Sequence, residues 1–366
     1  MRYVYKKKAL FFLATILDLL GAIISWPFKV FNPPEVPRKL SRILLMRMDH
    51  IGDIIMATAV LKPLREAFPE AQIDLIVSSW GADLIKNNPY TSRVIEFDPV
   101  WFDRKRSAGI FSQARGVKDL ARIIKEGKYD AAVDLRGDLR HILALFLSGI
   151  KCRVSYGITG GGFLLTHEVP YREGTHETEH SMDLVRVLGV SSGKPEVSIS
   201  LPGEANKRSD RVLEEDDISA PYAVFHAFPG HATKLWKNEN FSRVIDYVAK
   251  EKNAAAVLVG AGEDKKEASD IISMATEKAY DLTGRTDWGT LTGILKKAAL
   301  FVGVDSAPAH IAAALGVPTV VVFSSVNDPR QWAPKGDKVK ILCPGRGRDL
   351  SEVKAEDVCR VIDKMF

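Results

Sequence analysis

Polar residues suited to binding a phosphate follow the apolar run at 300–304. The run predicts a buried strand, and Asp305 and Ser306, directly after it, are good helix N-cap residues. Pro308 suits the first helical position, which puts His310 in the first turn. Free backbone N–H groups and the positive end of the helix dipole attract an anion there. The junction is therefore a candidate phosphate site, and a helix cap without a ligand is the plainer alternative.

A lysine and a glycine lie in the loop after another predicted strand, at 222–226. Lys234, which follows Thr233, offers a point charge for a phosphate, and Gly230 lets backbone N–H groups approach one. Because parallel strands end at one edge of a sheet, Lys234 is expected on the same edge as His310. A solvated surface lysine is the alternative.

The stretch at 257–268 contains the pair of glycines Gly260 and Gly262, as a dinucleotide-binding motif does. Lys265 occupies the place of the third glycine, so the motif is incomplete. Glu263 at this strand end could instead accept hydrogen bonds from ribose hydroxyls. An exposed helix cap is an equal alternative for Glu263.

Acidic residues gather where the apolar run at 42–47 gives way to a helical pattern. Asp49, His50 and Asp53 cluster there, and Gly52 allows a tight approach. A carboxylate at such a strand end can take the proton of an attacking hydroxyl, and general bases contribute roughly 10²–10⁴-fold. The helix N-terminus would keep Asp53 ionised, which suits a base but lowers its proton affinity. The alternative is that Asp53 only caps the helix.

The sequence gives little support for a metal site. His176 and His180 are four residues apart without a third ligand nearby, so a solvated helix start is favoured over zinc. The cysteines Cys152, Cys343 and Cys359 lie far apart and form no CxxC pair. This spacing favours a reducing compartment over a disulfide framework. We therefore expect no metal.

Two halves of alternating strand and helix patterns position these residues, divided by a Pro/Gly break at 200–204. The expected strands include 42–47, 72–78 and 131–137 in the first half and 222–228, 254–260, 300–304 and 318–323 in the second. The alternation predicts an α/β fold of two Rossmann-like domains, with parallel sheets covered on both faces. The active site is expected in a cleft between them. The glycine-rich stretch at 156–163 is expected to be a mobile loop.

The first forty residues form a separate segment. Residues 9–28 are apolar and twenty long, interrupted by Asp18, with basic residues at both ends. Large apolar residues dominate one side at helical spacing, which predicts a helix over 1–31 that lies in, or dips into, a membrane surface with both ends cytoplasmic. A helix packed on the body is the alternative. The proline-rich residues 32–41 are expected to be a stiff linker.

The net charge of +5 is confined to this segment, because residues 1–40 hold seven basic and two acidic residues. The rest of the chain is neutral. Its charge therefore gives no reason to expect nucleic acid as a partner.

Several of these stretches together resemble the heptosyltransferase-like glycosyltransferases of family 9. They are "ILLMRMDHIGDIIMATAVLKPLREAFPEAQIDLIV", "TKLWKNENF", "DLTGRTDWGTLTGILKKAALFVGVDSAPAHIAAALGVPTVVVF" and "NDPRQWAP", spread over 43–334. The resemblance implies a GT-B fold and metal-independent inversion at the donor sugar. It implies an acceptor-binding domain at 42–200, a nucleotide-sugar-binding domain at 201–345 and a C-terminal helix at 346–366.

The resemblance also implies roles for residues. Asp53 is then the catalytic base, Glu263 binds the ribose, and the donor diphosphate is held by Thr233, Lys234, Asp305, Ser306, Ala307 and His310. Candidates on the acceptor side are Asp49, His50, Asp134 and Arg136. The sequence departs from the family at Ala307, where glycine is usual, at "FSSVNDP", and at Pro63, which is expected to kink the first helix.

The function expected is transfer of heptose from ADP-heptose to a hydroxyl of a lipopolysaccharide core or other glycolipid, with no cofactor besides the donor. The enzyme would lie on the cytoplasmic face of the inner membrane as a peripheral or monotopic protein, bound through 9–28. Three alternatives stay open. They are a transferase with another nucleotide sugar, a non-hydrolysing nucleotide-sugar epimerase, and a non-catalytic nucleotide-sugar-binding protein.

Overall fold

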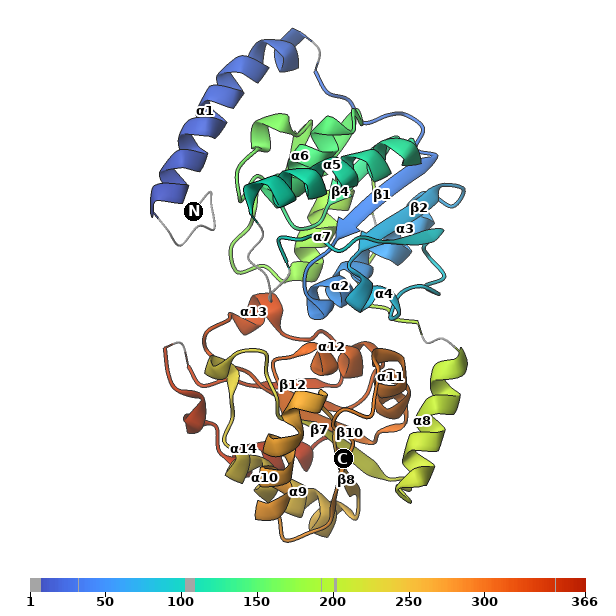
Figure 1. Cartoon of the computed structure of the whole chain (residues 1–366), viewed down its shortest axis with the longest axis vertical. Helices are drawn as coiled ribbons and strands as arrows, with labels where there is room; N and C mark the ends of the chain where they lie inside the picture. Colours follow the sequence, from blue (N-terminus) through green and yellow to red (C-terminus); the bar gives the residue numbers. More distant parts are fainter. Residues whose placement is uncertain (1–7, 32, 103–108, 192, 201–202, 346) are drawn as a thin grey trace. The chain divides into compact units, whose positions relative to one another are not determined.

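The computed structural model of the chain describes residues 8–31, 33–102, 109–191, 193–200, 203–345 and 347–366 (Figure 1). The chain divides into two compact units. Unit 1 comprises Met1–Ala82 and Asn88–Val197, and unit 2 comprises Asp83–Asn87 and Ser198–Phe366.

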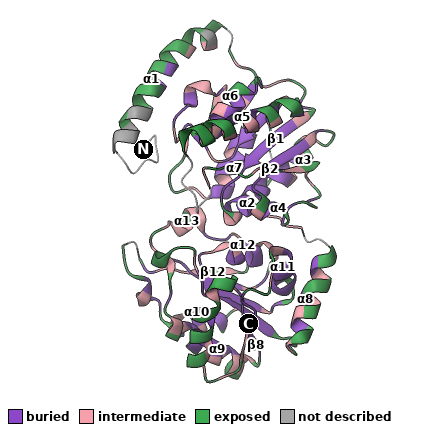
Figure 2. Cartoon of the chain, in the orientation of Figure 1, coloured by how far each residue is buried: buried purple, intermediate pink, exposed green. Residues whose placement is uncertain are grey.

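Unit 1 contains a six-stranded parallel sheet in the order β3-β2-β1-β4-β5-β6. Its strands are β1 (Arg42–Arg47), β2 (Gln72–Val77), β3 (Arg93–Glu96), β4 (Ala131–Asp134), β5 (Cys152–Ser155) and β6 (His167–Glu168). In the centre, Ile43 pairs with Ile73 of β2 and Ala131 of β4. The inner strands are buried on both faces, as Figure 2 shows, which is why their sequences are continuous apolar runs.

Helices connect these strands. They are α2 (Ile51–Ala57), η1 (Thr58–Val60), α3 (Leu61–Ala67), α4 (Ser79–Ala82), α5 (Ile110–Gly127), α6 (Leu139–Leu147), η2 (Gly162–Leu164) and α7 (Glu177–Arg186). The first helix is interrupted as Pro63 predicts, because α2 passes into the 3₁₀ turn η1 before α3 begins. Proline lacks the N–H that would bond to the carbonyl of residue 59, so the break lies one turn before it.

Within the described part of the N-terminal segment there is one helix, α1 (Lys8–Phe31), which contacts η2 of unit 1; residues 1–7 of the predicted helix lie outside the described residues. Among the described residues, no helix has the length and apolarity needed to cross a membrane. The glycine-rich stretch at 156–163 is more structured than a mobile loop. It contains η2, and Gly160 and Gly161 have positive φ values of +93° and +80°.

Unit 2 contains a second six-stranded parallel sheet, in the order β12-β11-β10-β7-β8-β9. Its strands are β7 (Tyr222–His226), β8 (Ala255–Leu258), β9 (Ala279–Asp281), β10 (Leu300–Val304), β11 (Thr319–Val322) and β12 (Val339–Leu342). Its helices are α8 (Gly203–Glu215), η3 (Ala232–Lys234), α9 (Asn238–Lys252), η4 (Gly262–Asp264), α10 (Lys265–Met274), α11 (Trp288–Lys297), α12 (Ala307–Ala314), α13 (Pro329–Trp332), η5 (Leu350–Glu352) and α14 (Ala355–Ile362).

Counted along each unit, both sheets have the doubly wound strand order 3-2-1-4-5-6. The connections therefore run in opposite directions from the first and fourth strands of each sheet. A crevice opens at this switch point, outside the carboxyl ends of the strands, and it is where such sheets bind ligands. In unit 1 it lies between β1 and β4, and in unit 2 between β7 and β10.

Candidate active site

Most of the predicted site residues lie at these two switch points. In unit 1, Asp49, His50 and Asp53 follow β1, and Asp134 and Arg136 end or follow β4. The set predicted for binding the donor belongs to unit 2. Within it Asp305, Ser306, Ala307 and His310 follow β10, Thr233 and Lys234 form η3 after β7, and Glu263 lies in η4 after β8.

An arginine organises the acidic residues of unit 1. Arg47, the last residue of β1, is buried and contacts three carboxylates. Its Nε donates to Asp49 Oδ1 at 2.8 Å, its Nη2 lies 3.2 Å from Asp53 Oδ1, and its Nη1 lies 3.4 Å from Glu177 Oε2. Nη1 also donates to the carbonyl of Leu135, which follows β4. Arg47 therefore ties β1, α2, α7 and the end of β4 to one point.

Charge balance at this point raises the proton affinity of Asp53. The carboxyl is buried in the first turn of α2, and burial raises its pKa. The neighbouring carboxylates of Asp49 and Glu177 raise the pKa further, and Arg47 opposes them only in part, so that it reaches about 7. Folding therefore produces a carboxylate that can take up a proton near neutral pH.

Asp49 has the opposite character although it is also buried. Burial alone would raise its pKa, but the guanidinium groups of Arg47 and Arg136 outweigh burial and hold the pKa below its usual value. Arg136 pairs with Asp49 Oδ2, and the indole of Trp80 donates to the Asp49 backbone carbonyl at 2.8 Å. Two carboxylates four residues apart thus have pKa values pushed in opposite directions, which is the pattern that separates a base from a charged positioning group.

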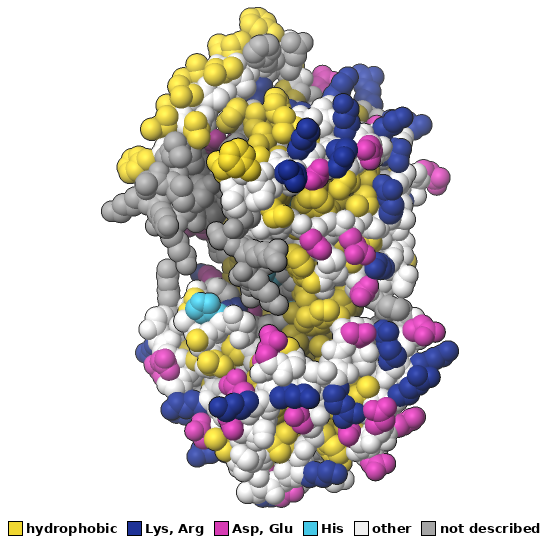
Figure 3. All heavy atoms as spheres, viewed as in Figure 1, with side chains coloured by type: hydrophobic (Ala, Val, Ile, Leu, Met, Phe, Trp, Pro, Cys, Tyr) yellow, Lys and Arg dark blue, Asp and Glu magenta, His cyan; other side chains and the backbone are white. Residues whose placement is uncertain are grey.

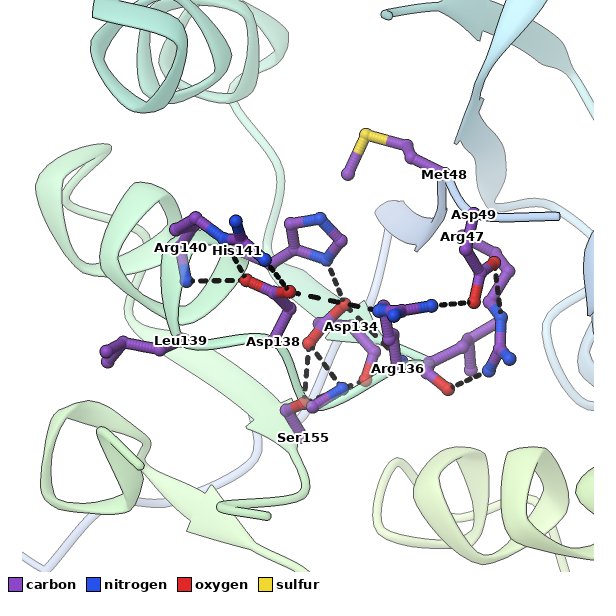
Figure 4. Close-up of polar contacts among 12 residues, drawn as sticks. Arg47, Met48, Asp49, Asp134, Arg136, Asp138, Leu139, Arg140, His141 and Ser155 are labelled. Carbon is purple, nitrogen blue, oxygen red and sulfur yellow. Dashed lines mark hydrogen bonds and ion pairs between the residues drawn. The ribbon is translucent and has the colours of Figure 1, made fainter. Parts of the chain in front are cut away.

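The Asp134 carboxylate is bound by His141 and Ser155, as Figure 4 shows. Its Oδ1 lies 2.8 Å from His141 Nδ1, and its Oδ2 accepts from Ser155 Oγ and from the N–H of Gly137, each at 2.8 Å. Asp138, four residues after Asp134, caps α6 by accepting from the N–H of Arg140. Asp134 therefore fixes the turn between β4 and α6, and Arg136 is the residue of this turn that reaches Asp49 (Figure 4).

Two aromatic rings lie against the arginines of this turn. The Arg136 guanidinium lies 4.4 Å from the centroid of Phe102, and that of Arg140 lies 5.1 Å from Trp101. Both arginine side chains stay about one third exposed, at 33% and 32%. Stacking restricts the arginines while leaving N–H groups for a ligand.

Sequence reasoning missed Arg47 and Glu177. A signal for Arg47 was present, because a charged residue ending a run of four buried apolar residues is unusual unless it has partners. Glu177 lies in the stretch predicted to be a solvated helix start, and that prediction was wrong. Glu177 and His180 are buried, and the His180 ring contacts Glu177 Oε1 at 3.0 Å and the Arg172 carbonyl at 2.8 Å. His176 caps α7, where it accepts from the N–H of Thr178.

His50 differs from its neighbours because its side chain is exposed at the start of α2. The structure thus brings Asp49, Asp53 and Arg136 together near Arg47. The Asp134 side chain instead contacts His141 and Ser155, and His50 lies at the surface.

In unit 2, Lys234 and Asp305 lie together. Lys234 Nζ is 2.6 Å from Asp305 Oδ2, which also accepts from the side-chain amide of Asn327 at 3.1 Å. The Lys234 side chain is 22% exposed, so the ammonium group can still reach a ligand. Thr233 is exposed beside it, and its carbonyl accepts from Ser324 Oγ at 2.9 Å.

A buried histidine holds Ser306. His226, the last residue of β7, has its Nδ1 3.0 Å from Ser306 Oγ, and burial lowers the pKa of His226 to about 4. Ser306 Oγ also donates to the Val304 carbonyl at 3.1 Å. Sequence reasoning missed His226. The signal for it was its position at the end of a strand, on the sheet edge that also carries Ser306.

The Ser306 side chain does not cap α12, although Ser306 is its N-cap residue. The first-turn N–H groups of α12 are therefore not satisfied by that hydroxyl. His310 is buried in the first turn, and Ala307 begins the helix. The junction thus combines a helix N-terminus with a lysine, an arrangement that suits a diphosphate.

Glu263 is exposed in η4, and it is Asp264 that accepts from the N–H of Ala261, at 2.7 Å. Gly284 lies against this turn with a φ of +72°, and a Cβ at Gly284 would come within 2.9 Å of the Gly262 Cα. The backbone beside Glu263 is therefore closely packed while its carboxylate faces solvent.

Comparison with known proteins identifies the family of the chain. Residues 117–360 match the model of glycosyltransferase family 9 (heptosyltransferase), which is more than half of the chain. Lipopolysaccharide heptosyltransferase 3 of Escherichia coli (strain K12) is 25% identical over 339 residues, covering 87% of this chain and 96% of that protein.

Two solved structures share the fold. One is a glycosyl transferase family 9 protein from Veillonella parvula DSM 2008 (TM-score 0.79, 20% identity, 90% of this chain and 98% of that one). The other is E. coli ADP-heptose lps heptosyltransferase II (TM-score 0.72, 18% identity, 88% and 98%). With its two parallel six-stranded sheets and its match to the family model, the chain belongs to glycosyltransferase family 9, the heptosyltransferase family, and is a glycosyltransferase.

Proposed function

We propose that this glycosyltransferase transfers heptose from ADP-heptose to a hydroxyl of a lipopolysaccharide core or a similar glycolipid. Family membership and the names of its relatives support the substrate class, since one relative is a lipopolysaccharide heptosyltransferase and a structural neighbour is an ADP-heptose heptosyltransferase. The observation that carries the reaction is Asp53, a buried carboxylate at the switch point of unit 1 whose pKa is raised to about 7.

In this proposal unit 2 holds the donor. Lys234 and the N-terminus of α12 bind the diphosphate, helped by Ser306 and Thr233, and Glu263 accepts from the ribose hydroxyls. When the bond between the anomeric carbon and the diphosphate breaks, negative charge develops on the departing ADP. The ammonium group and the helix N–H groups stabilise that charge, so the proposed reaction needs no metal.

In the same proposal Asp53 takes the proton of the acceptor hydroxyl. The oxygen then attacks the anomeric carbon from the side opposite the diphosphate, so the configuration of the sugar inverts. One C–O bond forms, one C–O bond breaks, and the proton ends on Asp53. Arg47 and Asp49 keep the carboxyl in place and set its proton affinity.

The glycolipid acceptor would be reached at the cytoplasmic face of the inner membrane, where the chain is peripheral or monotopic. The apolar side chains of α1 support membrane contact, because ten of them are more than half exposed. Transferring such side chains from water to an apolar phase contributes about 1 kcal/mol for each half-exposed group.

Mass spectrometry of acceptor and nucleotide after incubation with ADP-heptose tests the proposal. We expect ADP release and addition of one heptose only when acceptor is present, and Asp53→Ala should lower the rate by about 10²–10⁴-fold without weakening donor binding. Asp74→Asn is the matched control, since Asp74 is a buried carboxylate of the same sheet that pairs instead with Arg93.

Two results would contradict the assignment. Full transfer by Asp53→Ala would remove Asp53 as the base. Conversion of ADP-heptose to a different nucleotide sugar in the absence of acceptor would show that the protein is an epimerase.

A further inference from the structure

The helix α1 lies on unit 1 through a narrow polar stripe. Asp18 is buried there, and its Oδ1 accepts from the N–H of Gly161 at 2.7 Å. One turn further on, Gly21 is buried against Phe163, and a Cβ at Gly21 would come within 2.5 Å of that ring. Ser25 continues the stripe as a half-buried residue. The only acidic residue of the helix thus faces the protein.

Most of the remaining described side chains of α1 are apolar and exposed. Ten large apolar side chains of the described part of α1 are more than half exposed, with Ile24 at 70%, Trp26 at 66% and Phe31 at 81%. A helix at the surface of a water-soluble protein turns its apolar side inward. α1 has the reverse arrangement, with its polar stripe inward, which suits an apolar surrounding.

The exposed apolar surface continues from α1 onto α6. Leu139, at the start of α6, packs against Gly161, where a Cβ would lie 2.6 Å from its Cδ1. Along the same helix Phe146 and Leu147 are 46% and 55% exposed. Figure 3 shows apolar side chains gathered along α1 and over the adjoining part of unit 1.

Arg153 of β5 acts on residues of both helices. The Arg153 guanidinium lies 5.7 Å from the centroid of Phe146, and it lies near enough to Lys29 of α1 to lower the pKa of that lysine, behind the larger effect of burial. The loop at Gly161, which contacts both helices, therefore places α1 beside the start of α6.

We propose that α1 and the exposed side of α6 form a single docking surface, joined by the hydrogen bond from Gly161 to Asp18, and that its partner is an anionic lipid bilayer. The inference rests on the membrane contact proposed above and extends it to a second helix.

The basic residues that flank the apolar stretch of α1 in the sequence favour anionic lipid over a second copy of the chain. Residues 1–40 carry seven basic and two acidic residues, with four basic residues before the apolar stretch of α1 and Arg38 and Lys39 after it. Anionic headgroups attract such flanking charges, whereas two copies of the same surface would repel each other.

The docking surface is linked by hydrogen bonds to the β4–α6 turn, which carries Arg136. Thr159, in the loop that contacts Asp18, accepts from the N–H of Leu139 at 2.7 Å and donates to the Gly137 carbonyl at 2.8 Å. A bilayer on α1 and α6 would thus bring lipid headgroups to the β4–α6 turn, as a glycolipid acceptor requires.

Binding of the full chain to vesicles of phosphatidylglycerol with phosphatidylethanolamine, measured by flotation, tests the proposal. The double variant Phe146→Ser with Leu147→Ser should bind roughly 30-fold more weakly, because two half-exposed apolar groups are lost from the interface. The matched control, Met274→Ser with Phe366→Ser, removes two similarly exposed apolar residues from unit 2 and should bind as the parent does.

The hydrogen bond at Asp18 is tested in the same assay. With Asp18→Ala, α1 should still bind vesicles, but the Phe146/Leu147 substitutions should then have little effect, because α6 is no longer held beside α1. Asp18→Asn, whose amide oxygen can still accept, should restore the full effect of the Phe146/Leu147 substitutions. Thermal unfolding of each variant reports whether it is folded.

Each failure has a separate meaning. If the parent chain does not bind vesicles, the proposed membrane contact itself is wrong. If it binds and the α6 substitutions change nothing, the membrane contact stands and the extension to α6 is overturned. If the α6 effect persists in Asp18→Ala, the hydrogen bond does not join the two helices.

Discussion

At the scale of single residues, the proposed chemistry depends on a charge imbalance around Arg47. Two guanidinium groups, of Arg47 and Arg136, face the three carboxylates of Asp49, Asp53 and Glu177. Asp49 contacts both arginines and stays ionised, so the excess proton affinity falls on Asp53. A base with a pKa near the working pH combines a large deprotonated fraction with useful proton affinity.

The pH dependence of transfer should report this proton. Asp53 must be deprotonated to act as the base, so kcat/KM should fall about tenfold per pH unit below the pKa of about 7. Glu177→Gln removes one of the carboxylates that raise the pKa of Asp53, so the acidic limb should move to lower pH.

Glu179→Gln is the control for that shift, because Glu179 lies on the same helix, 3.8 Å from Arg186. An acidic limb that stays in place in Glu177→Gln would show that another group controls the rate.

Lys234 should account for much of the affinity for a diphosphate. Lys234→Ala should weaken ADP binding about 10–100-fold, because a hydrogen bond to a charged group contributes about 1.5–3 kcal/mol. Calorimetric titration with ADP measures the change. Lys237→Ala removes an exposed lysine three residues away and should have little effect. Equal losses in the two variants would show that only general positive charge matters.

The sequence could predict that site residues lie at strand ends, but not which of these residues contact one another. Asp53 was predicted as the base and Asp49, Asp134 and Arg136 as acceptor-side candidates. In the structure the Asp134 side chain faces His141, whereas the Arg136 side chain reaches Asp49. The contact between Arg47 and Glu177 crosses 130 positions of sequence, and no local pattern encodes it. The pKa of Asp53 depends on that contact, so its proton affinity was not predictable, and the helix-terminus argument had pointed toward lower affinity.

At the scale of elements, the strand–helix junctions after β1, β4, β7 and β10 position most of the candidate site residues. The β4–α6 turn needs Gly137, whose φ is +80° and whose added Cβ would lie 2.8 Å from the Tyr156 carbonyl oxygen. A residue with a side chain at this position would have a strained backbone, and its Cβ would clash with that oxygen. This glycine sets the direction in which Arg136 leaves the sheet.

Two alanine substitutions separate these effects. Gly149→Ala, at φ +77° with nothing within 4 Å, should cost only the left-handed strain of about 1–2 kcal/mol. Gly137→Ala should cost more, lower the Tm further by about 2–4 °C per additional kcal/mol, and reduce transfer. Thermal unfolding followed by circular dichroism measures both. Equal losses of stability would contradict the close contact at Gly137.

The central strands and the interruption of the first helix were predictable because their signals are local. Buried parallel strands give continuous apolar runs, and proline removes a specific helical hydrogen bond. The short edge strands β3, β6 and β9 have two to four residues, of which none is fully buried, and they lack such a signal. The exposure of α6 was equally hidden, since its composition alone predicts a buried helix.

At the scale of the whole molecule, the two units repeat one strand order and differ in the chemistry at the switch point. Unit 1 presents carboxylates and arginines, and unit 2 presents a lysine and a helix N-terminus. The sequence predicted this α/β class with two parallel sheets, because strand and helix patterns alternate twice. The same division of labour underlies the proposal that unit 1 handles an acceptor and unit 2 a nucleotide sugar.

The identity of the donor is the point on which the proposal depends most. Thermal unfolding of the full chain with ADP, UDP, GDP and CDP and their sugars tests it directly. A ligand at a hundred times its Kd stabilises the folded state by about 2.7 kcal/mol. We expect ADP and ADP-heptose alone to raise the Tm. Selective stabilisation by another nucleotide would contradict ADP-heptose as the donor.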